Sequence, residues 1–357
     1  MKNKTLLVSC ATLSSGGSER VLSILSNCFA NEYEKVIYLM WVHRPIFFKV
    51  DERIHLVDLE EEAGTKNIVK KMIWFRKFVY KTKPDLILSF LYPWSMKVIS
   101  SLMFTPFKII VSERRDARFV RGGKPVRMLR NLLYHRACGI VLQTDSNRPY
   151  YRGKLTKKLK VIYNPLQIEN QYLGLGLKTK KEDVVVAVGR LRFEKNYEYL
   201  IRSFNKFHLS HPTFKLIIYG EGEERDKLTN LIHELKLDNH VLLPGRTKEV
   251  FAKIADARIY VLSSVFEGMP NALLEAMCTG LPCISTKVSG ATELIKNRVN
   301  GILVDNGDEM QLANAMSYLA DNPEFAHNLA TEAVKLIDII NVKKIGNEWL
   351  EYLNKFM

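Results

Sequence analysis

Short apolar runs alternate with amphipathic stretches along the whole chain. Residues 5–10 form an apolar run that predicts a buried strand, and residues 19–31 place apolar side chains at helical spacing. Further strand-like runs follow at residues 36–41, 86–90, 108–112, 139–143 and 160–163. Strands that alternate with helices build a parallel sheet with helices on both faces, so the first half of the chain is predicted to be an α/β domain.

A second series begins after a polar stretch at residues 178–183. Its predicted strands are residues 184–188, 215–219, 240–243, 259–262 and 281–285, with helical segments between them. Pro165 interrupts regular structure between the two series. A last helix, within residues 341–357, carries Trp349, Leu350 and Leu353 on one side. The sequence therefore predicts two Rossmann-like α/β domains facing across a cleft, at residues 1–165 and 166–340, followed by this helix.

The composition excludes several classes of protein. The 357 residues are 47% hydrophobic and 25% charged, which is typical of a globular chain with about two domains and rules out a disordered, collagenous or coiled-coil chain. No apolar run approaches the roughly 18 residues that span a bilayer. The five cysteines are scattered and form no CxxC pair, so a disulfide framework or zinc site is not expected. Together with a start that lacks a signal-peptide pattern, this predicts a cytoplasmic protein.

The positive charge is concentrated in the first half. Residues 1–165 hold 30 Lys and Arg against 13 Asp and Glu, a net charge of +17, whereas the remainder carries −2. Such asymmetry predicts that one domain meets a polyanion: a nucleic acid, an anionic lipid or a phosphorylated substrate. The alternative is a basic surface that serves only solubility.

One basic segment covers residues 66–83. It holds seven basic residues and no acidic one, while Ile68, Met72, Phe75 and Val79 recur at helical spacing. This pattern predicts either a helix docked on the sheet or one that lies on an anionic membrane surface.

The second basic segment covers residues 119–136. Lys124, Arg127 and Arg130 stand three residues apart, which places them near one face of a helix and about 4.5 Å apart along its axis. Such a row matches a lipid-linked pyrophosphate, and the alternative is a solvated basic face. Glu113 and Arg114 follow the preceding strand, where Glu113 would orient or partly deprotonate an acceptor hydroxyl, or form a structural salt bridge.

The densest group of candidate residues lies at residues 266–275. Gly268 allows a close approach of a ligand to the backbone, and Pro270 suits the first turn of a helix. The start of that helix presents the backbone N–H groups of Met269, Asn271 and Ala272. Such groups favour the binding of a phosphate. Glu267 and Glu275 stand on either side and would bind hydroxyl-rich groups. The alternative is one acid that stabilises the helix dipole and one solvated glutamate.

Other candidates follow predicted strands of the second domain. Arg190 and Lys195, just after Gly189, are placed to neutralise a diphosphate leaving group. Gly220 and Arg246 also follow strands at the edge where open α/β sheets bind ligands. Each of these segments alone is also typical of an ordinary turn.

Taken together, these segments resemble glycosyltransferase family 4, the retaining nucleotide-sugar enzymes of GT-B architecture. The resemblance covers essentially the whole chain and is densest over residues 184–310. The matching residues are Gly16-Gly17-Ser18-Glu19-Arg20, Gly189-Arg190, Glu194-Lys195-Asn196, Glu267 seven residues before Glu275, Ser289-Gly290, Glu293-Leu294-Ile295 and Gly301-Ile302-Leu303-Val304. The architecture implies that the C-terminal helix returns to the N-terminal domain. The second basic segment resembles the acceptor-side helix of bacterial transferases that extend polyprenyl-diphosphate-linked glycans.

The resemblance implies a role for each matching residue. Arg190 and Lys195 would hold the donor diphosphate, Glu275 the nucleotide ribose and Glu267 the transferred sugar. The remaining donor-binding residues would be Gly16, Gly17, Gly189, Gly220, Arg246, Gly268, Met269, Pro270, Asn271 and Ala272. The acceptor-binding residues would be Glu113, Arg114, Lys124, Arg127 and Arg130. Arg190, Lys195, Glu267 and Glu113 would be catalytic. No metal or other cofactor is expected, since no DxD motif follows a strand.

These implications define the expected partners and the competing hypotheses. The partners would be a nucleotide sugar, UDP-linked by family frequency, a lipid-linked glycan and an anionic membrane surface at the inner face of the cytoplasmic membrane. The alternatives are a nucleic-acid-binding protein, for which no known signature is present, another GT-B enzyme such as a nucleotide-sugar epimerase or phosphorylase, and a non-catalytic partner subunit.

Overall fold

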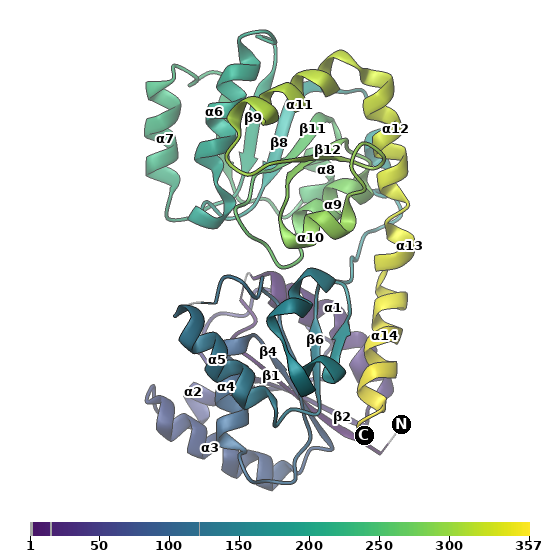
Figure 1. Cartoon of the computed structure of the whole chain (residues 1–357). Helices are drawn as coiled ribbons and strands as arrows, with labels where there is room; N and C mark the ends of the chain where they lie inside the picture. Colours follow the sequence, from purple (N-terminus) through teal and green to yellow (C-terminus); the bar gives the residue numbers. More distant parts are fainter. Residues whose placement is uncertain (1–2, 15, 121) are drawn as a thin grey trace. The chain divides into compact units, whose positions relative to one another are not determined.

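The structure, a computed structural model, describes residues 3–14, 16–120 and 122–357 (Figure 1). It divides into two compact units. Unit 1 is Met1–Gln167 together with Ile340–Met357, and unit 2 is Ile168–Ile339. The sequence placed the two boundaries at residues 165 and 340.

The described part of unit 1 contains a sheet of seven parallel strands in the order β3-β2-β1-β4-β5-β6-β7. Its strands are β1 (Thr5–Cys10), β2 (Lys35–Met40), β3 (His55–Asp58), β4 (Leu86–Phe90), β5 (Ile109–Ser112), β6 (Gly139–Leu142) and β7 (Leu159–Val161). Leu6 and Val8 pack in the core on one face of this sheet, and Leu7 packs in the core on the other. This alternation within one strand is what a sheet covered on both faces requires.

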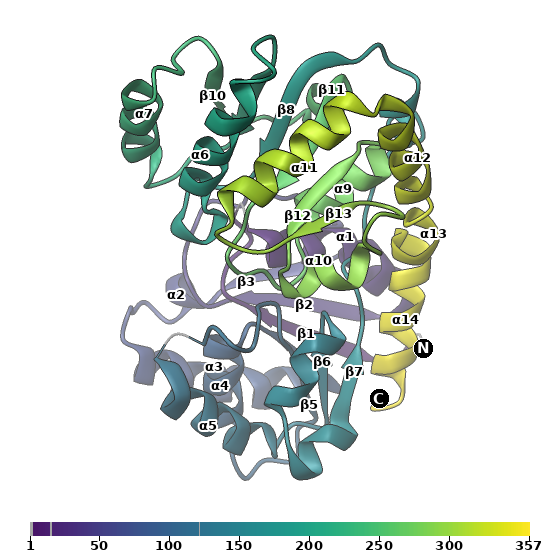
Figure 2. The ribbon, with the colours of Figure 1, turned by 45° about the horizontal axis from the view of Figure 1, so that its top comes forward.

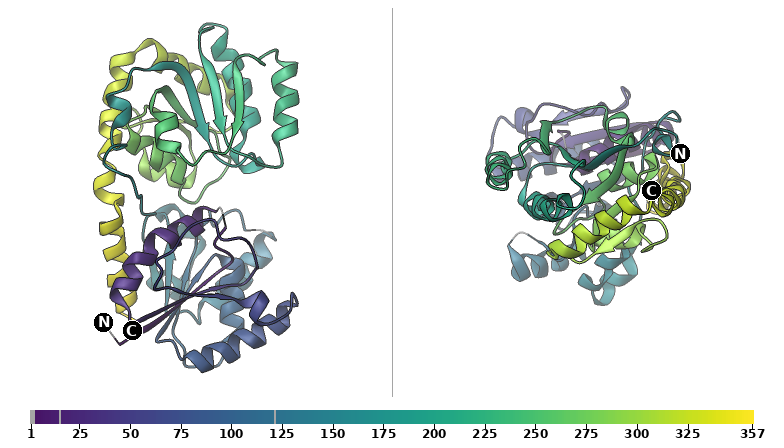
Figure 3. Two further views of the ribbon diagram at one scale, coloured as in Figure 1. Left: turned by 180° about the vertical axis from the view of Figure 1, so that it is seen from behind. Right: turned by 90° about the horizontal axis from the view of Figure 1, so that it is seen from above.

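Helices cover each face of the unit 1 sheet (Figures 1 and 3). They are α1 (Gly17–Glu32), α2 (Leu59–Glu62), α3 (Ile68–Thr82), α4 (Tyr92–Ser101), α5 (Gly123–Tyr134) and α14 (Val342–Asn354), with 3₁₀ segments η1 (Asp145–Tyr150) and η2 (Gly153–Lys158). Phe75 and Val79 of α3 are buried against the sheet. The basic segment at residues 66–83 is therefore a helix docked on the sheet, as one of the two hypotheses stated.

The last helix packs within unit 1, against α1. Trp349 is fully buried, and its ring lies 5.9 Å from that of Phe90. The Tyr33 hydroxyl donates a hydrogen bond of 2.9 Å to Asn354 Oδ1. Gly346 lets the two helices approach closely, since a Cβ there would lie 2.7 Å from Cys28 Sγ. The apolar side of α14 thus completes the core on the α1 face of the sheet.

Unit 2, all of whose residues are described, is built on six parallel strands in the order β10-β9-β8-β11-β12-β13. The strands are β8 (Glu182–Val188), β9 (Lys215–Tyr219), β10 (Val241–Gly245), β11 (Ala257–Leu262), β12 (Cys283–Thr286) and β13 (Ile302–Val304). The helices are α6 (Tyr197–His208), α7 (Arg225–Glu234), α8 (Val250–Ala255), α9 (Asn271–Thr279), α10 (Ser289–Leu294), α11 (Glu309–Asp321), α12 (Pro323–Val334) and α13 (Ile337–Ile340, which ends at the boundary), with 3₁₀ segments η3 (Leu175–Leu177) and η4 (Phe193–Lys195).

Both sheets reverse their strand order at an internal point. In unit 1 the reversal lies between β1 and β4, and in unit 2 it lies between β8 and β11. Open α/β sheets bind ligands outside the carboxyl ends of the strands at such points. No helix in the described ranges is long and apolar enough to cross a membrane.

Candidate active site

The candidate donor residues of unit 2 lie at one edge of its sheet. Gly189 follows β8, Gly220 follows β9 and Arg246 follows β10, while the loop at residues 263–270 follows β11. These four strands are neighbours in a parallel sheet, so their carboxyl ends share an edge. In Figure 2, the helices α9 and α10 lie close to β12 within unit 2. The topology thus gathers segments that are up to 80 residues apart in sequence.

An ion pair joins the loops that follow β8 and β11. Lys195 Nζ lies 2.5 Å from Glu267 Oε1, and the two side chains are 17% and 16% exposed. The Ser264 hydroxyl donates to the same carboxylate oxygen over 2.8 Å. Because neither side chain is fully solvated, water screens this contact only in part. Two residues that the sequence singled out separately are therefore in direct contact.

Two further hydrogen bonds tie these loops together. The backbone N–H of Val265 donates to Glu194 O over 2.9 Å, and the Ser263 hydroxyl donates to Lys195 O over 2.8 Å. Asn196 adopts a left-handed conformation with φ 52° at the start of α6, which turns the chain out of η4. The lysine is consequently held at the strand edge by its backbone as well as by its side chain. Ser263 and Ser264 were missed by the sequence analysis, although their position directly after a predicted strand marks them.

Glycines let the backbone segments pack closely at this edge. A Cβ on Gly220 would lie 1.8 Å from Gly189 O, and one on Gly189 would lie 2.6 Å from Tyr197 Oη. A Cβ on Gly290, the second residue of α10, would lie 2.5 Å from Gly268 O and 2.8 Å from Met269 Cα. No larger residue fits at these points without a shift of the loops. Glycine here serves close backbone packing next to the site.

The start of α9 forms the far side of the site. The helix begins at Asn271, and Pro270 precedes it in an extended conformation, so the prediction that Pro270 lies in the first helical turn was wrong by one residue. The Pro270 carbonyl accepts the N–H groups of Leu273 and Leu274 over 3.0 and 3.2 Å. Gly268 and Met269 are buried, while Asn271 and Ala272 are half-buried. The helix start carries a partial positive charge that favours an anion.

The other charged candidates of unit 2 differ in exposure. Arg190 and Arg246 are exposed. The hydrogen bond from Arg225 and, more weakly, the charge of Arg246 lower the pKa of Glu221. Glu275 lies one turn inside α9 and is only 2% exposed. A carboxyl group at such a position requires hydrogen-bonding partners.

In unit 1, Gly16 and Gly17 lie where β1 passes into α1. Gly16 precedes the helix and Gly17 is its first residue. A Cβ on Gly16 would meet the Glu19 carboxylate at 2.0 Å. That carboxylate accepts hydrogen bonds from Thr12 Oγ1 over 3.3 Å and from Ser18 Oγ over 2.6 Å. The expected contact of these glycines with a donor stays a prediction.

The structure corrects the prediction for Arg130. This residue was expected in an exposed row with Lys124 and Arg127, but its side chain is completely buried. Its guanidinium carbon lies 4.7 Å from the centre of the Tyr151 ring, and its Nη2 donates to Asn131 Oδ1 over 3.0 Å. A spacing of three residues turns a helix by about 300°, so the two steps from Lys124 to Arg130 carry the side chain about 120° away from the starting face. Arg130 therefore belongs to the interior of unit 1.

Glu113 and Arg114 are also buried, at 3% and 7% exposed. The Tyr134 hydroxyl donates to Glu113, and burial raises the pKa of Glu113 against the opposing charge of Arg130. Arg114 donates to Asn164, and burial lowers its pKa to about 9. The structure shows a hydrogen bond from a tyrosine to Glu113, whereas the alternative stated for this residue was a structural salt bridge. Both side chains are buried within unit 1, and their contact with an acceptor stays a prediction.

The fold and the comparisons identify the class of protein. Two units with parallel Rossmann-like sheets form the GT-B glycosyltransferase fold: sucrose-phosphate synthase from Thermosynechococcus elongatus is 17% identical and superposes with a TM-score of 0.85 over 99% of both chains. Anabaena Alr3699/HepE, solved in complex with UDP-glucose, is 18% identical with a TM-score of 0.80 over 99% of this chain and 100% of that one. At these identities the likeness establishes the fold.

Sequence comparisons point to the same class of protein. Residues 175–336, most of unit 2, match the family described as "Glycosyl transferases group 1". A relative from Campylobacter jejuni, "GalNAc-alpha-(1->4)-GalNAc-alpha-(1->3)-diNAcBac-PP-undecaprenol alpha-1,4-N-acetyl-D-galactosaminyltransferase", is 26% identical over 351 residues that cover 96% of each chain. The protein is a glycosyltransferase with a group 1 domain.

Proposed function

We propose that this chain is a retaining family 4 transferase that moves a hexose or N-acetylhexosamine from a UDP-sugar to a polyprenyl-diphosphate-linked glycan in the synthesis of a bacterial surface polysaccharide or glycan. The Lys195–Glu267 pair beside the start of α9 carries this proposal. The UDP complexes of structural neighbours and the undecaprenol-linked substrate in the name of the Campylobacter relative support its two halves.

In this proposal the donor diphosphate takes the place of Glu267 as the partner of Lys195. Breaking the bond between the sugar and the diphosphate leaves the bonding electrons on a phosphate oxygen, where negative charge grows. Lys195, Arg190 and the N–H groups at the start of α9 supply positive charge to that oxygen. Glu267, released from Lys195, then accepts hydrogen bonds from sugar hydroxyls. These protein groups would carry the leaving-group chemistry without a bound metal.

Replacement of Lys195 tests the donor half. Lys195→Ala should lower turnover by about 100-fold, because a preorganised charge at the leaving group is worth that much. The measurement is release of UDP from UDP-sugars, with and without a lipid extract that supplies the acceptor. Lys215→Ala, which removes an exposed lysine of β9 in the same unit, is the matched control and should retain full turnover. An unchanged rate in folded Lys195→Ala contradicts the assignment.

Glu275 is proposed to bind the ribose of the nucleotide. Glu275→Ala should weaken the binding of UDP by about 1.5–3 kcal/mol, the worth of a hydrogen bond to a charged acceptor. Titration calorimetry with UDP measures this, and circular dichroism checks that the variant is folded, since the side chain is buried. Glu267→Ala should mainly lower turnover instead. Equal UDP affinity in wild type and a folded Glu275→Ala would overturn this division of roles.

The acceptor half of the proposal rests on the exposed part of α5. Lys124 is exposed and Arg127 is half-buried, with its guanidinium carbon 5.5 Å from the centre of the Tyr150 ring. Gly122 and Gly123 both have positive φ angles at the start of this helix. A helix start followed at once by a lysine offers N–H groups and positive charge to a diphosphate.

The double variant Lys124→Ala/Arg127→Ala should raise the KM for a lipid-diphosphate acceptor about tenfold or more, since each charge-assisted hydrogen bond contributes about 1.5–3 kcal/mol. It should leave the slow hydrolysis of the donor unchanged, because the donor residues belong to unit 2. Initial rates with detergent-dispersed acceptor measure both. A wild-type KM in the double variant shows that these cations form only a solvated face. The Lys154→Ala/Lys157→Ala variant removes two exposed lysines of the same unit and should behave as wild type.

Membrane association is proposed for the same helical layer. Met128, Leu129 and Leu132 of α5 are 65%, 49% and 68% exposed, and Val69 and Ile73 of α3 are 60% and 53% exposed. Packing of α4 against both α3 and α5 places the three helices in one layer. Exposed apolar side chains among lysines and arginines are typical of a surface that binds anionic lipid.

Vesicles that contain phosphatidylglycerol should therefore sediment the wild-type protein, and added salt should release it because exposed charges are screened over about 8 Å at physiological ionic strength. Met128→Ser/Leu132→Ser should reduce the bound fraction at every lipid concentration. Leu209→Ser, at a leucine of unit 2 that is 83% exposed, is the control for loss of an exposed apolar side chain. Equal sedimentation of all three proteins counts against this surface.

A further inference from the structure

A group of metal-binding side chains lies outside the donor site, in unit 1. His43, Asp58 and Glu61 each offer one ligand atom, and these atoms all lie within 4.8 Å of one another. His43 belongs to the loop after β2, Asp58 is the last residue of β3 and Glu61 belongs to α2. Since β2 and β3 are parallel neighbours, the group lies at the carboxyl edge of the unit 1 sheet. The sequence analysis did not single out any of the three residues.

Two carboxylates approach the same nitrogen of the imidazole ring. His43 Nδ1 lies 2.9 Å from Asp58 Oδ2 and 3.0 Å from Glu61 Oε1. A ring nitrogen carries at most one hydrogen, so it cannot serve both oxygens with a full hydrogen bond. Two ligand atoms at about 2.1 Å from a tetrahedral ion are about 3.4 Å apart. The observed separations are a few tenths of an ångström shorter, so a small outward movement of the two carboxylates would make room for one ion between the three atoms.

Hydrogen bonds fix the Asp58 carboxylate and the backbone next to His43. Asp58 Oδ1 accepts the N–H groups of Glu60 and Glu61 over 3.0 and 3.2 Å, which leaves Oδ2 directed to His43. His43 follows Trp41 and Val42, whose N–H groups donate to Cys10 O and Ala11 O over 3.1 and 3.0 Å. The side chains of His43 and Glu61 are 55% and 64% exposed, so an ion could reach them from solvent.

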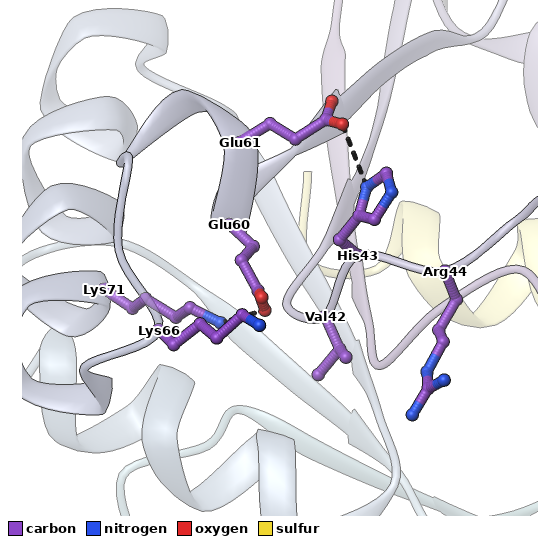
Figure 4. Close-up of a pocket in the computed structure, with 7 residues that line it drawn as sticks. All are labelled: Val42, His43, Arg44, Glu60, Glu61, Lys66 and Lys71. Atoms are coloured by element: carbon purple, nitrogen blue, oxygen red, sulfur yellow. Dashed lines mark hydrogen bonds and ion pairs between the residues drawn. The ribbon is translucent and has the colours of Figure 1, made fainter.

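The nearby lysine does not oppose a cation at this point. Lys71 is 4% exposed, and its Nζ lies 2.6 Å from Glu60 Oε2 and 2.9 Å from Trp41 O. Glu60 is therefore the direct ion-pair partner of Lys71. In Figure 4 the side chains of Lys66 and Lys71 point toward the Glu60 carboxylate, and the side chain of Arg44 extends away from the His43 imidazole. Asp58 and Glu61 remain to balance the charge of an ion.

A cavity opens beside the group. It has a volume of about 540 Å³ and is lined by Val42, His43, Arg44, Glu60, Glu61, Lys66 and Lys71 (Figure 4). An ion held by three protein ligands at the wall of a cavity keeps positions for water or for an oxygen of a further ligand. His43 and Glu61 themselves line this cavity, so the open positions of an ion bound to them would face it.

We propose that His43 Nδ1, Asp58 Oδ2 and Glu61 Oε1 bind a divalent transition-metal ion of the Zn²⁺ class, with its open positions directed to this cavity. One imidazole and two carboxylates favour Zn²⁺, Co²⁺ or Ni²⁺ over Mg²⁺, which prefers oxygen ligands and retains its water. None of the three residues is among the donor-binding candidates, and the proposal does not depend on the proposed reaction.

Titration calorimetry of the full chain with ZnCl₂ and with CoCl₂ tests the proposal, and Co²⁺ absorption near 500–600 nm reports imidazole and carboxylate ligation. The wild type should bind one equivalent that is lost in His43→Ala and weakened about tenfold or more in Glu61→Gln, the loss typical for a disturbed metal shell. Asp58→Asn should also weaken binding while it keeps the cap of α2, because an amide oxygen accepts the same two N–H groups. MgCl₂ should not compete at equal concentration.

Matched controls exclude binding at other residues. His55→Ala removes the exposed histidine of β3, and Glu62→Gln removes the neighbouring exposed acid of α2, so both should bind Zn²⁺ as the wild type does. Thermal melting of each variant without metal checks that the fold is kept. Absence of a saturable Zn²⁺ site in the wild type overturns the proposal. Equal loss in the His55→Ala control, or equal binding in folded His43→Ala, overturns it as well.

Discussion

The contact between Lys195 and Glu267 is the interaction on which the functional edge of unit 2 depends. It joins the loop after β8 to the loop after β11. A backbone hydrogen bond from Val265 to Glu194 O and one from the Ser263 hydroxyl to Lys195 O hold the same two loops together. These loops flank the point where the strand order reverses. A lysine that is paired with a carboxylate before a substrate arrives is already in place and desolvated, so a diphosphate that replaces the carboxylate meets a preorganised charge.

The fold followed closely from the hydrophobic pattern because both sheets are parallel and buried on both faces. Such strands read as short continuous apolar runs, and Val184 to Val188 is a clear example. Element ends were less well predicted. The sequence began the first helix at residue 19, whereas Gly16 caps α1 and the helix starts at Gly17. Glycine has no helical signal, so only the geometry of the loop shows where such a helix begins.

The sequence predicts which residues make up the candidate donor site, but it does not predict which of them contact one another. Gly189, Lys195, Glu267 and the start of α9 follow strands in the sequence, and a parallel sheet brings strand ends together. A local sequence pattern does not show which charged side chains pair with one another, as Lys195 and Glu267 do. The same limit explains Arg130 and Glu113 in unit 1: both are charged, yet both are buried, because Tyr134 and Tyr151 provide a polar lining that helical spacing does not reveal.

Buried cations also change the meaning of the net charge of unit 1. Lys71, Arg114 and Arg130 are each 7% exposed or less, so they add to the formal charge without adding to the surface that a partner meets. Each is held by a specific acceptor: Glu60 for Lys71, Asn164 for Arg114 and Asn131 for Arg130. Part of the charge that remains outside lies on α3 and α5, next to their exposed apolar side chains. The proposal of a lipid surface rests on this combination, since the phosphate backbone of a nucleic acid offers no apolar phase for side chains such as Met128 and Leu132.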